Sequence, residues 1–200
     1  MPDFTLEDRY PAPVAGVDEA GRGPWAGPVV AAAVVLDREA VPEGLNDSKK
    51  LSAKRREILF EKIRETAMVG VGIGTVEEID RIGVGRANDL AMCRAVEEMG
   101  SSPAFVLVDG IWLPKMLAFP ARPIKKGDAR SLSIAAASII AKVTRDRIMA
   151  GLDAECPGYG WRTNQGYGTA EHANALQRLG VTPHHRRSFR PIHNILYQEN

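Results

Sequence analysis

The chain has 200 residues, of which 44% are hydrophobic and 26% are charged. This ordinary globular composition excludes a disordered tail, a fibre and a disulfide-stapled mini-protein. The longest apolar run, residues 29–36, is far shorter than the roughly 20 residues that a membrane-spanning helix needs, and the first residues lack a signal-peptide pattern. The two cysteines, Cys93 and Cys156, form no metal or disulfide framework. We therefore expect a cytoplasmic protein with reduced thiols.

Charge is distributed unevenly along the chain. The formal net charge is +1, but residues 1–109 hold 13 basic and 19 acidic side chains, whereas residues 110–200 hold 13 basic and 6 acidic ones. Such asymmetry is typical of a surface with a basic side that binds phosphates. Half of a sequence is not a surface, so charge alone leaves nucleic acid as one partner among several.

Two strands are predicted first. Val14–Asp18 is apolar and is followed by the turn residues Gly21-Arg22-Gly23-Pro24. Val29–Leu36 is a continuous β-branched and alanine run, which is typical of a buried strand. The turn between them predicts a hairpin.

Helices and strands then alternate. Ser52 is placed to cap a helix that reaches about Ala67. In the strand predicted at 69–73, branched residues alternate with glycine, which indicates that another element approaches closely. Thr75 and Glu78 form a capping box that opens a short helix.

The second half continues this alternation and predicts an α/β fold with a mixed sheet. The helical span before residue 104 allows the strand that ends in Asp109 to run parallel to the first strand, which would bring Asp18 and Asp109 to one edge of the sheet. The predicted elements are a helix from about Arg86 to Met99, the strand Phe105–Val108, a short strand Arg122–Ile124, a helix from about Ser131 to Ala154, and a last helix capped by Thr169 and ended by Gly180.

Four carboxylates stand at strand ends or at a helix start. Asp18-Glu19 ends the first strand, Asp109 ends a later one, and Asp128 precedes the long helix. Neighbouring residues of a strand face opposite sides, so Asp18 and Glu19 converge only if the chain bends at the glycine turn. Taken singly, each acid is equally well explained as a cap or a solvated strand end.

Taken together, the four carboxylates predict an all-oxygen site for hard divalent cations. Mg²⁺ and Mn²⁺ prefer such ligands. Two such ions roughly 3.5–4 Å apart can activate water and stabilise the leaving oxygen in phosphodiester cleavage. Crowded carboxylates would otherwise repel one another, so the cluster makes physical sense with cations bound.

Several motifs stand in a fixed order between residue 14 and about residue 192. They are Val17-Asp18-Glu19-Ala20-Gly21-Arg22-Gly23-Pro24, Ala26-Gly27-Pro28-Val29-Val30-Ala31-Ala32-Ala33, Asn46-Asp47-Ser48-Lys49-Lys50-Leu51-Ser52, Val108-Asp109-Gly110, Lys126-Gly127-Asp128, Ile134-Ala135-Ala136-Ala137-Ser138-Ile139-Ile140-Ala141-Lys142-Val143-Thr144-Arg145-Asp146, Asn164-Gln165-Gly166-Tyr167-Gly168-Thr169, His172 and His185-Arg186-Arg187-Ser188-Phe189. On these motifs and their order, the chain resembles ribonuclease HII, the bacterial type 2 ribonuclease H.

This resemblance implies an RNase H-like mixed sheet flanked by helices. It implies one catalytic domain over residues 1–200, with a helical, basic C-terminal extension from about 155 that contributes to substrate binding. The implied activity is a metal-dependent endoribonuclease that degrades the RNA of RNA/DNA hybrids. It would also cut on the 5′ side of a ribonucleotide embedded in duplex DNA, leaving 3′-hydroxyl and 5′-phosphate ends.

The resemblance also assigns roles to residues. Asp18, Glu19, Asp109 and Asp128 match the family's catalytic, metal-binding carboxylates. The backbone of Gly21, Arg22 and Gly23 would contact the ribose 2′-hydroxyl. Tyr167 would sense the same 2′-hydroxyl and pack its ring on the next deoxyribose. The 2′-hydroxyl both donates and accepts hydrogen bonds, and it is the group that distinguishes RNA from DNA.

Basic residues then become candidate phosphate contacts, which position a duplex without reading its sequence. Asp146 stands four residues after Lys142, so a local ion pair competes with its use as a substitute for Asp128. We expect His172 to be structural and His184 and His185 to lie in a surface loop. The candidates are Lys49, Lys50, Lys142, Arg145, Arg186 and Arg187.

Some questions stay open. Trp25 stands beside the Gly-Arg-Gly turn where the family pattern has a smaller aliphatic residue, with an effect that the sequence does not define. We expect a monomer, and the tail after Ile192 carries no clear sliding-clamp motif. The alternatives are another carboxylate-metal nuclease of this fold that cuts DNA, and a hybrid-binding module without catalysis.

Overall fold

The computed structural model describes residues 1–197 and is built on one five-stranded sheet of order β3-β2-β1-β4-β5. β1 pairs antiparallel with β2, which pairs antiparallel with β3, whereas β4 runs parallel to both β1 and β5. The mixed sheet and the parallel return are therefore confirmed. The strands are β1 (Val14–Ala20), β2 (Val29–Leu36), β3 (Ala67–Gly74), β4 (Phe105–Asp109) and β5 (Ala121–Ile124).

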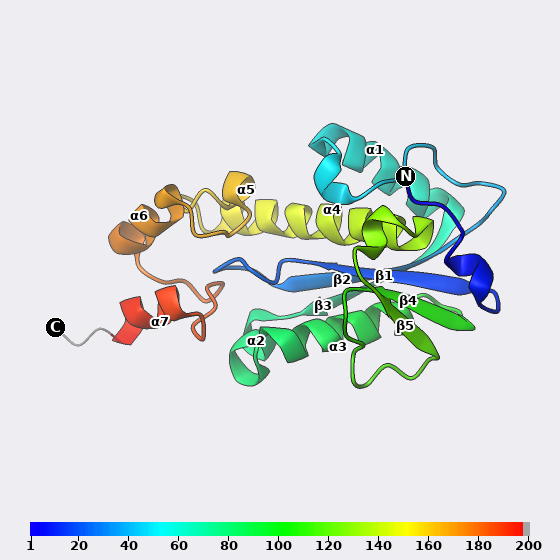
Figure 1. The fold of residues 1–200 in the computed structure, drawn as a ribbon. Coiled ribbons are helices and arrows are strands. Elements are labelled where there is room, and N and C mark those ends of the chain that lie inside the picture. The colour runs from blue at the N-terminus through cyan, green and yellow to red at the C-terminus, as the bar shows by residue number, and fades with distance from the viewer. Residues whose placement is uncertain (198–200) are drawn as a thin grey trace.

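Helices cover both faces of this sheet (Figure 1). One face carries α1 and α4 and the other carries α2 and α3, while α5, α6 and α7 lie beyond the end of the sheet. The helices are α1 (Ala53–Thr66), α2 (Val76–Ile82), α3 (Val84–Glu97), α4 (Leu132–Glu155), α5 (Trp161–Asn164), α6 (Ala170–Leu179) and α7 (Arg190–Tyr197), with 3₁₀ turns at Glu7–Arg9, Ser48–Lys50 and Gly127–Ala129.

The predicted helix caps form. Ser52 Oγ accepts from the Arg55 amide, and Thr75 and Glu78 make both hydrogen bonds of the capping box. Thr169 caps α6. The expectation that this helix is the last was wrong, because α7 follows. Pro191 in its first turn was the available signal, since proline suits that position.

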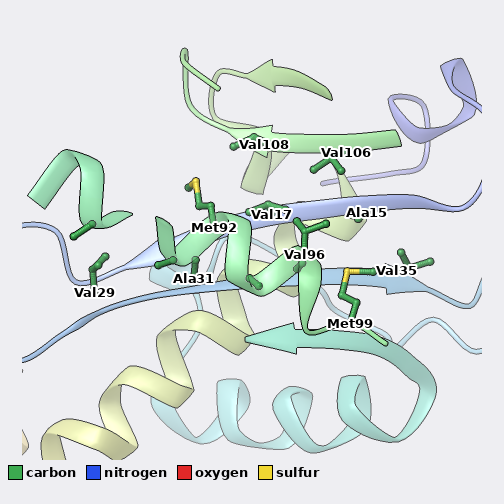
Figure 2. Close-up of a cluster of buried hydrophobic side chains, with 14 of the residues drawn as sticks. Ala15, Val17, Val29, Ala31, Val35, Met92, Val96, Met99, Val106 and Val108 are labelled. Carbon is green, nitrogen blue, oxygen red and sulfur yellow. The ribbon is translucent and has the colours of Figure 1, made fainter. Parts of the chain in front are cut away.

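The sheet face under α3 holds one apolar cluster, shown in Figure 2. Val17, Val106 and Val108 of β1 and β4 pack there against Met92 and Val96 of α3. The glycines of β3 let the α3 backbone approach. A Cβ at position 70 or 72 would overlap a carbonyl oxygen of α3. The close approach predicted from the alternating glycines is confirmed.

A separate cluster joins the C-terminal segment to the rest of the molecule. Trp161, Leu176 and Ile192 pack with Met149 of α4 and with Ala26 of the loop between β1 and β2. This packing sets the segment from α5 to α7 against the loop that follows the C-terminal end of β1. Among the described residues, no helix is long and apolar enough to cross a membrane.

Candidate active site

The carboxylates meet where β1 and β4 end. Val17 pairs with Val108 in parallel register, so Asp18 and Asp109 follow at the same edge of the sheet. The Gly127 amide donates to Asp109 Oδ1 over 2.6 Å, which holds the 3₁₀ turn containing Asp128 against β4. The sequence-based expectation that Asp18 and Asp109 share an edge is therefore confirmed.

Glu19 reaches the same place in spite of the strand alternation. Asp18 and Glu19 both line a cavity of about 380 Å³, together with the glycine turn. β1 continues to Ala20, and the chain then turns at Gly21, whose φ is +97°. Arg22 Nη1 lies 3.5 Å from Glu19 Oε1. Asp18 and Glu19 are both still paired with β2, so the predicted bend lies after them, at Gly21, and the two acids line the cavity from successive positions of the strand.

The carboxylates interact electrostatically, and both this interaction and burial shift their pKa values. Burial raises the pKa of Asp18 well above its ordinary value, and the charges of Glu19, Asp109 and Asp128 raise it further. Burial likewise raises the pKa of Glu19, against the opposing charge of Arg22. Burial and then Asp109 raise the pKa of Asp128. Acidic groups are thus concentrated at this edge, with Arg22 and Lys49 as the opposing positive charges.

Basic and aromatic side chains border the cavity. Lys49, Lys142 and Tyr167 line it with the carboxylates. Burial lowers the pKa of Lys49, but Asp18, Asp128 and other acids outweigh this and raise it overall. Tyr167 is half exposed. Lys50 is exposed and does not line this cavity.

Arg186 holds the glycine turn from inside the protein. Its side chain is fully buried, and its guanidinium donates to the carbonyls of Gly21, Arg22 and Gly27 over 2.6–3.0 Å. The expected phosphate contact does not agree with this position, because the side chain is buried and each of its three nitrogens donates to a backbone carbonyl. The neighbouring Arg187 is exposed.

Arg145 joins the same turn region to the loop that carries Tyr167. Its guanidinium donates to the carbonyls of Ala26, Pro28 and Gln165 over 2.9–3.1 Å. Only 2% of the residue is exposed, and burial lowers its pKa to about 10. Arg145 was also expected to contact phosphate, and its placement instead makes it a scaffold for two loops.

Trp25 completes this junction. Its amide donates to the Gly166 carbonyl, and its carbonyl accepts from the Arg186 amide, both over 2.8 Å. Its ring leaves no space for a side chain at Gly168. Trp25 therefore connects the loop on both sides of Tyr167, at Gly166 and Gly168, with the backbone of Arg186.

Two buried histidines extend the scaffold. His172 Nδ1 lies 3.0 Å from the Tyr167 carbonyl, which can only accept, so this nitrogen carries a proton. The bare His172 Nε2 accepts from Trp161 and from His185 Nε2, and the Thr182 amide donates to His185 Nδ1. Both rings are neutral in this network. The expectation of a surface loop at His185 was wrong, because that ring is fully buried.

Acid should break this network. Burial, and then His172, lower the pKa of His185 to about 3, against about 6.5 in an unfolded chain. A lowered folded pKa means that the stability contribution is complete above about pH 6.5 and is lost as pH falls toward 3. The melting temperature of the wild type should fall as the pH is lowered from 8 to 5. His185→Gln should be less stable at pH 8 but should lose less on acidification, and an equal slope in both proteins would contradict this assignment.

A second group of side chains that can bind metal lies away from the four carboxylates. Among the described residues, Glu155, Cys156 and His184 bring three ligand atoms within 4.8 Å of one another, at the C-terminal end of α4. No three of the four carboxylates are so tightly spaced. Asp146 pairs with Lys142 over 2.6 Å, as its spacing predicted.

A mixed α/β sheet whose strand ends gather four carboxylates beside basic side chains defines the class of carboxylate-dependent phosphodiester hydrolases. The family model described as Ribonuclease HII matches residues 15–192. Ribonuclease HII of Ruegeria pomeroyi is 57% identical over 203 residues, covering 100% of this chain and 87% of that protein. The chain belongs to the ribonuclease HII family and is an endoribonuclease that acts on RNA/DNA hybrids.

Solved structures agree. The crystal structure of ribonuclease H2 from Pyrococcus horikoshii superposes with a TM-score of 0.76 at 30% identity, covering 91% of this chain and 96% of that one. A ribonuclease HIII in complex with Mn²⁺ has the same TM-score at 20% identity, covering 92% of this chain and 68% of that one, and supports the fold alone. The RNase H-like architecture is confirmed.

Proposed function

We propose that Asp18, Glu19, Asp109 and Asp128 hold divalent cations, Mg²⁺ or Mn²⁺, with which the chain cuts on the 5′ side of a ribonucleotide. The observation that carries this proposal is the convergence of the four acids at the ends of β1 and β4, with burial and mutual repulsion raising the pKa values of three of them.

The residues present fit such ions. All four donors are carboxylate oxygens, the ligands that hard cations prefer. Their repulsion is the cost that a bound cation removes.

Bound cations would supply Lewis acidity at the phosphate and lower the pKa of water. The chain's own contribution is to hold the acids in place. Asp109 is fixed by the Gly127 amide, and Asp18 Oδ1 accepts from the Glu19 amide over 2.7 Å. Arg22, beside Glu19, is the exposed cation nearest to these acids and faces the substrate's negative charge.

The glycine turn and Tyr167 would recognise the ribose of the ribonucleotide and the deoxyribose that follows it. The two lie together, because a Cβ at Gly23 would touch the Tyr167 ring at 3.4 Å. Backbone groups of Gly21-Arg22-Gly23 can approach a 2′-hydroxyl that a side chain would block. The Tyr167 hydroxyl would meet the same group, and its ring would pack on the next sugar, where a missing 2′-oxygen leaves room. Such a pair selects an RNA-to-DNA junction.

Four of the six basic candidates remain as contacts to the substrate's phosphates. Lys49, Lys50 and Arg187 are exposed, and the half-buried Lys142 lines the first cavity, whereas Arg145 and Arg186 are buried. The segment from about 155 supplies Tyr167 and Arg187, so we assign it to substrate binding within one domain over residues 1–200. The whole site lies in a single chain, which suits a monomer.

The cellular setting is part of the proposal. A protein that removes ribonucleotides from a bacterial chromosome works in the cytoplasm. A ribonuclease HII from Archaeoglobus fulgidus, 27% identical, was solved in complex with PCNA, with a TM-score of 0.76, covering 88% of this chain and 95% of that one. Ile195, Leu196 and Tyr197 of α7 are exposed and offer a clamp an apolar contact.

A DNA duplex with one ribonucleotide tests the proposal. Cutting only at the 5′ side of the ribonucleotide, with Mg²⁺ or Mn²⁺ and not with chelator, is expected. An all-DNA duplex should stay intact, and its cleavage would favour the DNA nuclease. Binding of a hybrid without cutting at any metal concentration would favour the binding module.

Tyr167→Ala should lower kcat/KM on a single embedded ribonucleotide by at least about tenfold, since it removes a hydrogen bond and a ring contact. Cleavage of a long hybrid should fall much less, because such a substrate offers many sites. Tyr167→Phe should keep the ring contact and lose the hydroxyl's share only. Equal losses on both substrates would remove Tyr167 from junction sensing.

A further inference from the structure

The loop between β4 and β5 exposes an apolar cluster that the proposed function leaves unused. Trp112 is 80% exposed, Met116 77% and Ile111 60%. Single exposed apolar residues are normal, whereas several gathered together indicate an interaction site. This loop directly follows the catalytic candidate Asp109.

The loop is anchored at both ends. The Gly110 amide donates to the Ile124 carbonyl over 3.0 Å, and the Leu117 amide donates to the Pro114 carbonyl over 3.2 Å. Leu117 and Phe119 pack against the cluster under α3. In Figure 1 the loop lies on the α3 side of the sheet. Trp112 is therefore presented on a held backbone.

Trp112 lines a second cavity, of about 470 Å³, that reaches the catalytic edge. Glu19 and Asp109 line its inner part, and Ile111 lines it beside Trp112. Arg22, Arg86 and Lys115 bring positive charge to the same cavity, where the acids are Asp89 and, at the edge with the candidate metal ligands, Glu19 and Asp109. An apolar ring beside three cations suits a sugar-phosphate chain. Met116 is on the loop but does not line the cavity.

The two cavities share a wall. Glu19 and Arg22 line both, and Tyr167 lines only the first. Under the proposed function, the first cavity takes the ribonucleotide and its 3′ neighbour, and the carboxylates take the phosphate on the 5′ side. The strand that continues from that phosphate must leave away from Tyr167, and the second cavity, which Tyr167 does not line, adjoins the carboxylates at Glu19 and Asp109.

We propose that the second cavity is the subsite for the cut strand on the 5′ side of the scissile phosphate. Trp112 packs on a deoxyribose of that strand, and Arg86 and Lys115 face its phosphates. This inference rests on the proposed function and adds a strand, a polarity and a residue to it.

Steady-state cleavage of a duplex with one ribonucleotide tests the role of Trp112. Trp112→Ala should raise KM by about fivefold or more and leave kcat within about twofold, because a contact with a sugar that does not react binds the ground state and the transition state equally. Trp112→Phe should recover most of the loss. Met116→Ala, an equally exposed change on the same loop, should behave as the wild type.

Spacer substrates test the polarity. A three-carbon spacer replaces one sugar and base at the first, second or third position on the 5′ side, at matched 3′ positions, or in the complementary strand. The lower KM of the wild type relative to Trp112→Ala should disappear only when the spacer is on the 5′ side in the cut strand.

Other outcomes overturn the inference in distinguishable ways. Loss of that advantage only with a 3′ or complementary-strand spacer, or equal KM values for Trp112→Ala and Met116→Ala, would reject this subsite and leave the proposed function standing. A wild-type protein that cuts no ribonucleotide-containing duplex would reject the proposed function itself.

Discussion

Asp18→Asn is expected to remove cleavage while the protein stays folded. Asp18 lies where β1 meets β4 and interacts with all three other carboxylates. Metal ions supply several kcal/mol of transition-state stabilisation, and a factor of ten is about 1.4 kcal/mol, so kcat should fall at least about a thousandfold. Single-turnover cleavage at saturating Mg²⁺ measures this.

The matched control is another acid near the cavity. Asp146→Asn should keep most of the activity, because its carboxylate pairs with Lys142 and lines neither cavity. A loss in Asp146→Asn as large as that in Asp18→Asn would return Asp146 to the ligand set. Full cleavage by a clean Asp18→Asn preparation would remove Asp18 from it.

In the absence of metal, Asp18→Asn should be more stable against unfolding than the wild type. The folded pKa of Asp18 is raised, first by burial and then by Glu19, Asp109 and Asp128, above an unfolded value of about 3.9. A raised folded pKa means that the carboxyl's contribution is complete below about pH 4 and is lost as pH rises through the folded value.

Melting in chelator should show this difference. Asp18→Asn should melt higher than the wild type at pH 7.5, and the gap should narrow toward pH 4. Mg²⁺ should raise the melting temperature of the wild type more than that of the variant, because a ligand stabilises only the state that binds it. A gap independent of pH would show that crowded charge is not its cause.

The strands and carboxylates were readable because each has a local signal. The apolar run of β2 matched its observed bounds, and the glycine alternation in β3 indicated the approach of α3. The helical span before β4 allowed a parallel return, which then placed Asp109 beside Asp18. Asp128 was grouped with the other acids by its position, although a helix-start acid taken singly has an ordinary explanation as a cap. Only the resemblance singled out Tyr167, since a loop tyrosine has several ordinary explanations.

The scaffold behind the site was not readable, because it depends on contacts between distant segments. Arg145 and Arg186 resembled the exposed charges that basic residues usually are. Their burial follows from loop carbonyls at Gly21, Ala26 and Gln165 that need donors once the loops pack. No sequence pattern shows where those carbonyls will point.

Arg186→Met should uncouple the glycine turn from the site. The carbonyls of Gly21, Arg22 and Gly27 lose their donor. Because Arg22 is exposed, its carbonyl can bind water more easily than the other two. We therefore expect the free energy of unfolding to fall by about 2–4 kcal/mol. Arg186→Lys should recover little, because one ammonium cannot reproduce the planar fork. Denaturant unfolding measures both changes.

The neighbouring Arg187→Met is the matched control, and the pair separates positioning from phosphate contact. Arg186→Met should lower kcat on an embedded ribonucleotide by more than about tenfold well below its melting temperature, because small misplacements of a recognition loop are costly. Arg187→Met should unfold within about 0.5 kcal/mol of the wild type. It should raise KM and reduce the slope of log KM against log salt by about one, as expected for one lost phosphate contact. A guanidinium committed to backbone carbonyls releases no counterion when the duplex binds, so Arg186→Met should leave the salt slope of log KM unchanged. A reduced salt slope in Arg186→Met, together with unchanged stability, would instead make Arg186 the phosphate ligand.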